Sequence, residues 1–595
     1  MRQPRRSAPR ARPTRRRATE RHVEALQAAT AQAQPRRRLG VFLLIYLLLT
    51  AVLGWRLVTV QVVSAGEYRD LAERQAVHEV ELPAERGTIY DRRGEPLAIS
   101  VPAAAIYASP PVIAEEGIDP TFLAADLAPL LDMEVPTLLD RLTADTGFVY
   151  LDRQVPRAVG SQIDSMQLPG VGVLSEPKRM YPAGALGSQV IGFAGIDGDG
   201  LAGLELGLDD LLAGTPGRLR QEGAPGGVQI SSAPREIEPS LPGQDVVLTI
   251  DRAVQGTVEQ LLDEAVARYG ALGASAVVLD VDSGEILAAA SSPGFDPTDL
   301  DNAEQEHIAN AALTSVIEPG SVNKAMTVAA ALEEGVLDDG EALWVPPALT
   351  VAGQEFTDAA PRPADSLDVA TIMAESSNVG AILIGERLSH EVHHRYLEAF
   401  GLGASTGTRF PAESAGILPP VPRWYGPTQA SISLGHGASS TLLQTAGVYQ
   451  TLANDGVRVH PRLVRGVVDG DGTIVELDPH EETTVVSPAT AAAVNRMLEE
   501  VVERGTGQQA TVPGYRVAGK TGTAQKPSAT ALGYTQDAYL ATFAGFAPTD
   551  APELAVAVVV DEPQGAFYGG RVAAPLFSDI MEAALPLRRV APDTP

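Results

Sequence analysis

The sequence predicts an α+β domain in the C-terminal part of the chain, behind a separate middle region and a single membrane anchor. Two observations lead to this prediction. Residues 39–63 form an apolar run directly after a block of arginines. From residue 243 onward, strand-like runs come first, helical periodicities follow and strand-like runs return at the end. That order is typical of a sheet that joins distant parts of a sequence.

The composition describes a folded chain of several domains. Its 595 residues are 45% hydrophobic and 20% charged, which is too apolar for a disordered protein. The formal net charge of −30 opposes binding to nucleic acid. The chain contains no cysteine, which excludes disulfide scaffolds, thiolate-bound metal centres and cysteine nucleophiles.

The N-terminal region has the pattern of an uncleaved membrane anchor. Residues 1–38 hold twelve arginines and two glutamates, a net charge of +10, so the rest of the chain carries −40. The apolar run at residues 39–63 contains one charge, Arg56, near its far end, and about 20 apolar residues cross a bilayer core. Because arginine-rich flanks stay in the cytoplasm, we expect residues 1–38 inside the cell and the acidic remainder outside.

Other interpretations of this region fit less well. A cleaved signal peptide has a shorter apolar core and small residues at a cleavage site, which residues 51–54 hardly offer. A buried core helix does not normally follow a block of arginines. The tail itself is interpreted as a disordered orientation signal, with binding to DNA or anionic lipid as the alternative.

Residues 64–242 form the predicted middle region, which mixes short strand-like and helical segments. Residues 84–98 alternate like a strand and are broken by two glycines. Residues 200–217 predict a short helix between glycines, and residues 223–234 predict an exposed hairpin or linker. No repeat of 20–50 residues appears, which argues against a solenoid or propeller.

Residues 243–595 carry the elements of the α+β domain. Residues 245–250 predict a strand, and Asp251 stands at the N-cap position of a helix that Gly270 ends. Two apolar runs flank residues 282–284 and predict a hairpin. Further helices are predicted at residues 322–334 and 491–502, and further strands at residues 539–547 and 554–560.

Lysine is the most informative residue type. Only four of the 45 basic residues are lysines: Lys178, Lys324, Lys520 and Lys526. Arginine supplies positive charge elsewhere in the chain, but it does not lose its proton in proteins. A lysine that is kept therefore indicates a task in which a buried amine becomes neutral. Ser321 precedes Lys324 by three residues at the predicted start of a helix, so both side chains lie on one face. Such a lysine can serve as base for the serine hydroxyl, although a lone S-x-x-K also arises by chance at an ordinary N-cap.

Two later motifs strengthen the signal. Ser376-Ser377-Asn378 fits S-x-N, in which Ser376 can relay protons and the Asn378 amide can position a lysine or a substrate carbonyl. GKTGTA lies on a predicted strand, where a lysine and two threonines can bind a carboxylate while a glycine lets a substrate approach the backbone. Its residues are Lys520, Thr521, Gly522 and Thr523. In this order, S-x-x-K, S-x-N and K-T-G together indicate acyl transfer by a serine nucleophile.

At this point the sequence resembles the penicillin-binding proteins, specifically the membrane-anchored class B transpeptidases that cross-link peptidoglycan. The resemblance covers about residues 39–580 and includes RGTIYDRRGEPLA, RMYPAG, GLAGLE, PGQDVVLTID, EPGSVNKAMT, SLGHG, LANDG and GKTGTA. EPGSVNK and TLLQTAGVYQTLANDGVRV resemble the actinobacterial division-type (septal) enzymes. The family implies a serine β-lactamase-like domain with an antiparallel sheet flanked by helices.

The resemblance implies a role for each residue of the first two motifs. Ser321 attacks the penultimate D-Ala carbonyl of a donor stem peptide and is acylated, with Lys324 as general base. Ser376 and Asn378 relay protons and orient the substrate. An amine of a neighbouring stem peptide then resolves the acyl-enzyme, and β-lactams acylate the same serine.

The third motif is implied to bind the substrate. Lys520, Thr521 and Thr523 hold its terminal carboxylate beside Gly522, and the backbone N–H groups of Ser321 and Thr523 form the oxyanion hole. No cofactor and no metal ion is expected.

The resemblance also implies an organisation and partners. Residues 1–38 are the cytoplasmic tail, 39–63 the transmembrane anchor, 64–242 an elongated non-catalytic pedestal of the dimerisation type, and 243–595 the transpeptidase domain. Expected partners are stem peptides, β-lactams, a polytopic lipid-linked-glycan polymerase and other division proteins. The expected location is the cell membrane at the division septum.

Two rival functions would use the same motifs. A D,D-carboxypeptidase or β-lactamase of the same fold would hydrolyse the acyl-enzyme. The anchor, the large segment before residue 243 and the lack of an E-x-x-L-N run argue against this rival. A non-catalytic scaffold or penicillin sensor would keep the pocket and use residues 64–242 to dock other proteins.

Several residues imitate other sites. HEVHH at residues 390–394 formally matches the zinc-protease pattern H-E-x-x-H, but no third ligand is evident and a polar helix face is the simpler interpretation. His436 in SLGHG is expected near the active site, with a structural or substrate-lining role rather than general base catalysis. Trp344, Trp424 and Tyr425 are expected to pack rather than to bind carbohydrate.

Overall fold

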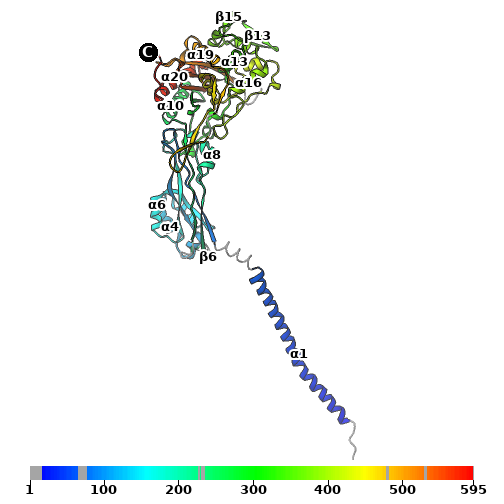
Figure 1. Ribbon diagram of the computed structural model, residues 1–595. Helices are drawn as coiled ribbons and strands as arrows, with labels where there is room; N and C mark the ends of the chain where they lie inside the picture. The colour runs from blue at the N-terminus through cyan, green and yellow to red at the C-terminus, as the bar shows by residue number, and fades with distance from the viewer. Residues whose placement is uncertain are drawn as a thin grey trace, which may run out of the picture. The chain divides into compact units, whose positions relative to one another are not determined.

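The computed structural model describes residues 16–64, 77–224, 228–229, 235–477, 481–527 and 533–593, and it divides into two compact units (Figure 1). The first unit comprises residues 1–80 and 219–236, and the second comprises residues 81–218 and 237–595. The predicted hairpin or linker at residues 223–234 lies largely outside the described residues.

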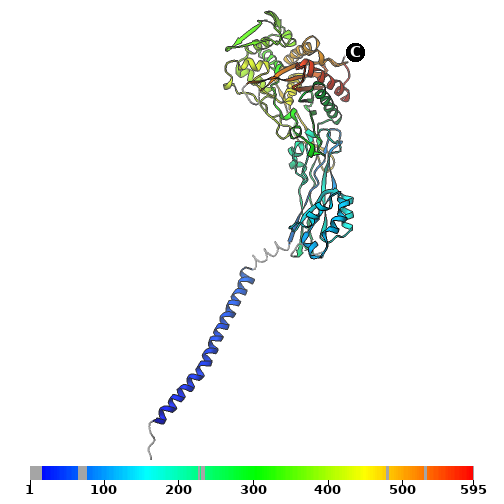
Figure 2. The same cartoon turned by 180° about the vertical axis from the view of Figure 1, so that it is seen from behind.

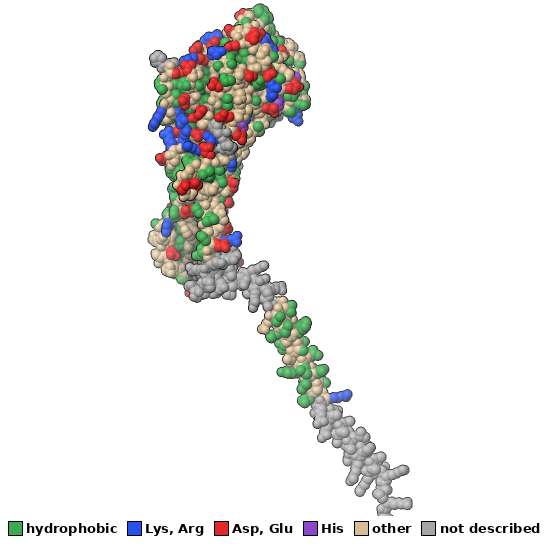
Figure 3. Space-filling model, in the orientation of Figure 1, with side chains coloured by type: hydrophobic (Ala, Val, Ile, Leu, Met, Phe, Trp, Pro, Cys, Tyr) green, Lys and Arg blue, Asp and Glu red, His purple; other side chains and the backbone are tan. Residues whose placement is uncertain are grey.

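One long helix dominates the first unit. Helix α1 (Arg16–Val58) continues into a π-helical turn, η1 (Thr59–Val63). Its part Arg37–Val63 is the one helix in the described chain long and apolar enough to cross a membrane, and it agrees with the predicted anchor at residues 39–63. Hydrophobic side chains cover this part of the helix in Figure 3. A four-stranded sheet pairs β1 (Val77–Leu82), β6 (Gly217–Ala224), β7 (Val228–Gln229) and β8 (Arg235–Glu238).

The middle region builds a mixed sheet with helices packed on it. Its elements are β2 (Ile89–Tyr90), β3 (Pro96–Ala108), α3 (Pro110–Glu115), α4 (Pro120–Leu131), α5 (Val135–Leu142), β4 (Val149–Pro156), α6 (Arg157–Ser165), β5 (Val171–Met180), α7 (Ser188–Ile191), α8 (Gly203–Gly207), α9 (Asp209–Leu212) and β9 (Asp245–Leu248). Apolar side chains of α4, α5 and α6 form one core with β3 and β4, and Figure 1 shows α4 and α6 beside these strands.

This sheet also recruits strands from the far end of the sequence. Its order is β18-β17-β9-β2-β3-β4, with β5 also paired to β3. Strands β17 (Val464–Val468) and β18 (Ile474–Glu476) come from the late part of the chain. The sheet therefore crosses the predicted boundary at residue 242.

A buried ion network joins three of the sequence landmarks in this region. Arg86 of RGTIYDRRGEPLA places Nε 2.5 Å from Glu205 Oε2, and Arg179 of RMYPAG places Nε 2.7 Å from Glu205 Oε1. Glu205 belongs to GLAGLE and is fully buried, and Arg86 also contacts Asp209 at 2.6 Å. Since each buried charge is paired, removal of one partner would leave another uncompensated.

The remaining chain forms the α+β domain. Its helices and helical turns are α10 (Arg252–Tyr269), η2 (Leu300–Asn302), α11 (Gln305–Ile308), α12 (Ala311–Thr314), η3 (Gly320–Asn323), α13 (Lys324–Glu333), α14 (Val369–Ala374), α15 (Asn378–Gly385), α16 (His390–Ala399), η4 (Val421–Arg423), α17 (Thr428–Leu434), α18 (Leu442–Ala453), α19 (Pro488–Glu503), η5 (Gln508–Ala510) and α20 (Gly569–Leu587). Its strands, besides β17 and β18, are β10 (Gly273–Asp280), β11 (Ile286–Ser292), β12 (Ala342–Val345), β13 (Ala348–Val351), β14 (Gln354–Thr357), β15 (Asp365–Asp368), β16 (Val457–Val459), β19 (Glu482–Thr484), β20 (Ala518–Pro527), β21 (Tyr534–Ala547) and β22 (Leu554–Asp561).

The central sheet of this domain is antiparallel and has the order β11-β10-β22-β21-β20, so it joins distant parts of the sequence as predicted. Both faces are covered: α10 and α20 pack on one face, and α18 packs on the other. The side chains alternate accordingly, since Ala276 and Val278 face the first group of helices while Val277 and Leu279 belong to the second core. Figure 2 shows the red C-terminal helix α20 lying across the orange strands.

Local signals in the sequence placed several elements correctly. Asp251 caps α10 by accepting a hydrogen bond from Ala253 N, and Gly270 ends the helix in a left-handed conformation. β10 and β11 form the predicted hairpin around residues 282–284. The late strands and the helix α19 also occur where they were predicted, with ends that differ by a few residues.

Candidate active site

The S-x-x-K motif lies on a tight turn followed by a helix. Ser321 belongs to the 3-10 turn η3, and α13 begins at Lys324 rather than at the serine as predicted. Gly320 adopts φ +64°, and a Cβ atom there would lie 3.2 Å from Thr523 O. The glycine therefore lets the turn with Ser321 lie directly against the strand that carries K-T-G.

Lys324 is fully buried and connects the first motif to the second. Its Nζ donates to Ser376 O at 2.7 Å and to Asn378 Oδ1 at 2.8 Å, and lies 3.3 Å from Ser376 Oγ. Burial lowers the pKa of Lys324 to about 7, although the charge of Asp358 partly opposes this shift. A large share of the amine is therefore neutral near pH 7, as a proton acceptor requires.

Asp358 fixes the S-x-N turn. Its carboxylate accepts hydrogen bonds from Ser377 Oγ at 2.9 Å, Asn378 N at 2.6 Å and Val379 N at 3.0 Å. These bonds satisfy free N–H groups at the start of α15 and add to the N-cap that Ser377 provides. Ser376, just before this turn, has a positive φ of 59°, a strained conformation for a residue with a side chain.

The K-T-G motif lies on β20, the edge strand of the central sheet. Lys520 is fully buried, and burial together with the nearby Lys324 lowers its pKa well below the usual value. Thr521 Oγ1 lies 2.7 Å from Thr506 Oγ1, and Thr523 Oγ1 accepts a hydrogen bond from Gly569 N at 2.9 Å. The two threonines of the motif are thus held by separate parts of the chain.

Gly522 is required for close packing of the site, and its predicted role in the approach of a substrate stays a prediction. A Cβ atom at this position would lie 2.1 Å from Thr542 Oγ1 and 2.6 Å from Pro319 O. Pro319 immediately precedes the turn that contains Ser321. The absence of a side chain at Gly522 therefore sets how closely that turn approaches β20.

The three motifs thus meet in one site from separate elements: η3 and α13, the start of α15, and β20. Contacts link Lys324 to the S-x-N residues and the Gly320–Ser321 turn to Thr523, and the two lysines are close enough for each charge to oppose the other. A serine, a partly neutral amine and backbone N–H groups at a helix start are the components of acyl transfer.

Comparisons with known proteins agree with this geometry. The chain matches the family described as "Penicillin binding protein transpeptidase domain" over residues 274–582 and "Penicillin-binding Protein dimerisation domain" over residues 81–248. The chain belongs to the penicillin-binding protein transpeptidases. Its helix Arg37–Val63 is long and apolar enough to anchor it in a membrane.

Individual relatives of this penicillin-binding protein are similar over almost the whole chain. Penicillin-binding protein PbpB of Mycobacterium tuberculosis is 37% identical, over 96% of this chain and 88% of that protein. The peptidoglycan D,D-transpeptidase FtsI of Escherichia coli K12 is 34% identical, over 92% and 91%. The crystal structure of penicillin binding protein 3 from M. tuberculosis complexed with aztreonam matches with a TM-score of 0.69 at 34% identity, over 87% of this chain and 99% of that one. These relatives confirm the predicted family and its division-type branch.

Sequence reasoning missed three residues around the site of this penicillin-binding protein. Asp358 follows a short hairpin strand, and no local pattern marks it as a partner of residues 377–379. Thr506 lies between two glycines just after α19, and nothing in the sequence around it indicates a role at the site. Glu318 lies in EPGSVNK and accepts hydrogen bonds from Gly437 N at 2.8 Å and from Tyr534 OH at 3.0 Å.

HEVHH forms the expected polar helix face only in part, because His390 and Glu391 are exposed but His393 is buried. His393 is fully buried, and its Nε2 atom lies 3.2 Å from Thr327 Oγ1. The rings of His390, His393 and His394 lie 5.6–5.8 Å from the ring of Trp424, measured between centroids. Burial lowers the pKa of His393 to about 4, so this imidazole is neutral at pH 7.

Two expectations about aromatic residues were wrong. Trp424 is buried as predicted, but Trp344 is 66% exposed and Tyr425 is 78% exposed. Trp344 lies on β12 of a separate two-stranded sheet, β12–β15, whose strands alternate between buried and exposed residues. An apolar side chain on the outer face of such a small sheet has no second layer to cover it.

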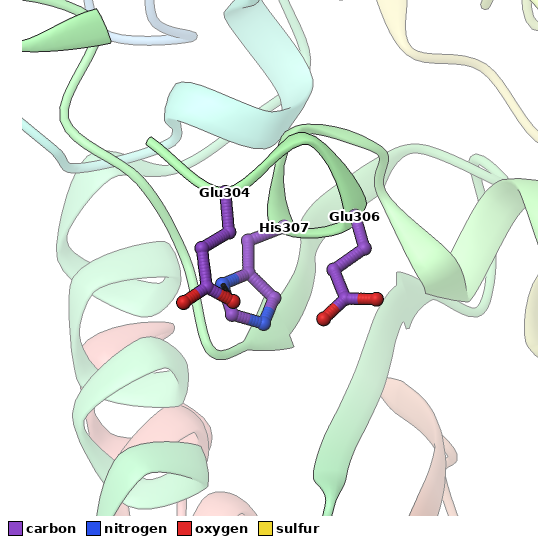
Figure 4. Close-up of side chains that lie close together, drawn as sticks. All are labelled: Glu304, Glu306 and His307. Carbon is purple, nitrogen blue, oxygen red and sulfur yellow. Dashed lines mark ion pairs between the residues drawn. The ribbon is translucent and has the colours of Figure 1, made fainter. Parts of the chain in front are cut away.

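The described residues contain one group of three possible metal ligands: Glu304, Glu306 and His307, shown in Figure 4. Their ligand atoms lie within 4.8 Å of one another at the short helix α11. Both glutamates are exposed, and exposed acidic groups of this kind are common without an ion. We assign no metal ion to this group.

Proposed function

We propose that this protein is a septal peptidoglycan D,D-transpeptidase that joins stem peptides through an acyl-enzyme on Ser321. The observation that carries the proposal is the buried Lys324, whose amine contacts Ser376 and Asn378 beside the turn that holds the serine. A lysine with a pKa of about 7 can accept the proton of a serine hydroxyl at physiological pH.

The reaction follows from these positions. Ser321 Oγ attacks the carbonyl of the penultimate D-Ala while its proton passes to Lys324, and Ser376 relays that proton to the nitrogen of the departing D-Ala. The N–H groups of Ser321 and Thr523 stabilise the oxyanion. The amine of a second stem peptide then attacks the ester carbonyl, and the bond to Ser321 Oγ breaks as this oxygen takes a proton.

The K-T-G strand binds the donor peptide. Because β20 is the edge of its sheet, its outer backbone groups can pair with an extended peptide. Lys520, Thr521 and Thr523 bind the terminal carboxylate. A carboxylate next to Lys520 favours the protonated amine there, and that charge in turn helps to keep Lys324 neutral.

The anchor gives the orientation of the chain. Because residues 1–38 are rich in arginine, this tail lies in the cytoplasm and the catalytic domain lies outside the cell. Residues 64–242 are the non-catalytic region, which docks a polytopic lipid-linked-glycan polymerase and other division proteins. The names of the relatives PbpB and FtsI support a role in division.

Mass spectrometry after exposure to penicillin tests the proposal. Trypsin releases residues 269–324 as one peptide, because no lysine or arginine lies between Arg268 and Lys324. We expect this peptide to gain the mass of one penicillin and to lose that gain in the variant Ser321→Ala. Ser315→Ala is the matched control, since this exposed serine lies on the same peptide.

Two results would contradict the proposal. An adduct that turns over within seconds would indicate a β-lactamase. Full cross-linking of the cell wall by cells that carry only Ser321→Ala would indicate a scaffold or a penicillin sensor.

A further inference from the structure

A second group of titratable side chains lies beside the turn that carries Ser321, and none of them belongs to the three motifs. His436 Nδ1 lies 2.9 Å from Glu318 Oε2, and Tyr534 OH donates to the same oxygen at 3.0 Å. The ring of Tyr534 meets the ring of His436 edge to face, with centroids 6.0 Å apart. These three residues are named the Glu318 cluster.

The backbone fixes this cluster relative to the nucleophile. Gly320 N donates to Gly435 O at 3.1 Å, and a Cβ atom on Gly435 would lie 1.8 Å from Gly320 O. Gly437 N donates to the carboxylate of Glu318 at 2.8 Å. Residues 435–437 are therefore held against residues 318–320, and His436 is placed next to the turn that contains Ser321.

The imidazole presents one nitrogen to the carboxylate and the other away from it. The Glu318 side chain is 10% exposed, whereas the His436 side chain is 32% exposed. An ionised carboxylate only accepts hydrogen bonds, so Nδ1 carries the proton and Nε2 carries the free lone pair. A carboxylate that contacts Nδ1 in this way fixes the orientation of the ring and leaves Nε2 as the accepting nitrogen.

Charge at the cluster favours a cationic amine. Burial alone would raise the pKa of Glu318, but hydrogen bonds from His436, Gly437 and Tyr534 and the nearby imidazole lower it overall. Burial and the Glu318 carboxylate raise the pKa of Tyr534 to about 12, so the phenol stays neutral. Glu318 and Tyr534 are the titratable groups that face His436 among the described residues, and they leave one negative charge beside the ring.

The second half of the reaction requires a base that the first half does not. An acceptor amine arrives protonated at neutral pH and must lose a proton before it can attack an ester. Lys324 is buried and held by Ser376 and Asn378, and in this half of the reaction it must return a proton to Ser321 Oγ, so a further base is needed to deprotonate the ammonium group. His436 is partly exposed, is held against the same turn by residues 435–437, and its Nε2 has no hydrogen-bond partner among the described residues.

We propose that His436, oriented by Glu318, takes the proton from the ammonium group of the acceptor peptide, and so serves as a general base instead of having the structural or substrate-lining role expected from the sequence. The inference rests on the proposed transpeptidase function and assigns its second step. The ammonium group transfers one proton to Nε2, and the free amine attacks the acyl carbonyl. The nitrogen then gives a second proton to Lys324, which passes it to Ser321 Oγ as the ester bond breaks, and imidazolium releases its proton to water.

The test compares two acceptor amines with the full-length protein in detergent. The donor is a D-alanyl thioester, and the acceptors are D-alanine, which is protonated at pH 7.5, and hydroxylamine, which is neutral. We expect His436→Gln to lower the rate of aminolysis by D-alanine about 100-fold more than it lowers the rate of acylation by penicillin. A loss of this size is in the range of general base catalysis. Aminolysis by hydroxylamine should fall by less than about 3-fold, because this amine has no proton to lose before attack.

Two further variants sharpen the test. Glu318→Gln should lower D-alanine aminolysis about tenfold, because the amide replaces the carboxylate that orients the ring through Nδ1. His460→Gln, a partly exposed histidine elsewhere, is the matched control and should leave both acceptors unaffected. Thermal melting of each variant shows whether the fold is retained.

The results distinguish a histidine that acts as a base from one that only supports the turn. An equal loss with both amines, or a loss of penicillin acylation as large as that of aminolysis, would show that His436 only supports the turn. Unchanged D-alanine aminolysis in His436→Gln would overturn the inference while Ser321 still binds penicillin. Failure of penicillin to label Ser321 in the unaltered protein would overturn the proposed function itself.

Discussion

The burial of Lys324 predicts that acylation of Ser321 by penicillin follows the titration of one amine near pH 7. Burial lowers the pKa of this amine from 10.5 to about 7. At pH 7 about half of the molecules then carry the neutral base, compared with about one in 3,000 for an ordinary lysine. The buried position therefore increases the concentration of active base about a thousandfold.

The sign of the pH dependence follows from this pKa. Below about pH 7 the neutral fraction of Lys324 rises tenfold per pH unit, and above it the fraction becomes constant. We expect the second-order rate constant of acylation, measured with a fluorescent penicillin between pH 5 and 9, to follow that curve. Lys324→Arg should lower the rate about 10²- to 10⁴-fold at all these pH values, because arginine keeps its proton.

Asp358 allows a second, more specific test of the pKa of Lys324. Its negative charge raises the pKa of Lys324, so Asp358→Asn should move the midpoint of the curve to lower pH. Asparagine keeps an oxygen that can accept from Asn378 N and Val379 N, which preserves the turn. Glu375→Gln is the matched control, because this carboxylate lies nearby in sequence and its side chain is 56% exposed.

Two results would refute the reasoning. A rate that is flat from pH 5 to 9 would show that no amine with a pKa near 7 limits acylation. A midpoint that moves to higher pH in Asp358→Asn would contradict the electrostatic effect of this carboxylate on Lys324.

Three further predictions concern stability and packing. Arg86→Ala should lower the free energy of unfolding in urea by about 3–5 kcal/mol, because it leaves buried carboxylates unpaired, while Arg268→Ala at an exposed ion pair should cost less than about 0.5 kcal/mol. The pKa of His393 is about 4 when folded and 6.5 when unfolded, so the unfolded chain binds more protons between these values and stability falls as pH drops through this window. This should cost about 3 kcal/mol by pH 4, a loss that His393→Gln removes from the pH dependence of the melting temperature. Gly522→Ala should slow penicillin acylation about 100-fold, because the added Cβ atom would push the turn with Ser321 away from β20. The control is Gly447→Ala in α18, where a Cβ atom has free space. It should leave acylation unchanged and add about 0.5–1 kcal/mol to the free energy of unfolding. An acylation rate unaffected by Gly522→Ala, or an Arg86→Ala protein as stable as its control, would contradict the respective argument.

Features that depend on neighbouring residues were predictable from the sequence. The cap of α10 at Asp251, the hairpin around residues 282–284 and the apolar anchor each follow from a short local pattern. The motifs around Ser321 and Lys520 were predictable for a similar reason, because the chemistry of acyl transfer restricts which residue types can stand at these spacings.

Features that depend on distant contacts were not predictable. Asp358 is buried against the start of α15 by the fold of a hairpin, and its own neighbours in sequence are unremarkable loop residues. The pairing of β17 with β9 joins residues more than 200 positions apart, so no periodicity indicates it. The reason for Gly522 was likewise hidden, because the atoms that exclude a side chain belong to Pro319 and Thr542.

The scarcity and burial of lysine also make this protein suitable for conjugation at a single chosen position. Amine-directed reagents need an accessible amine, and Lys324 and Lys520 are fully enclosed. Lys526 is paired with Asp561 and Glu562 at 2.8 Å. Apart from the α-amino group, Lys178 on β5 is thus the preferred point for attaching a dye or a surface linker, and it lies on a strand outside the domain that carries Ser321.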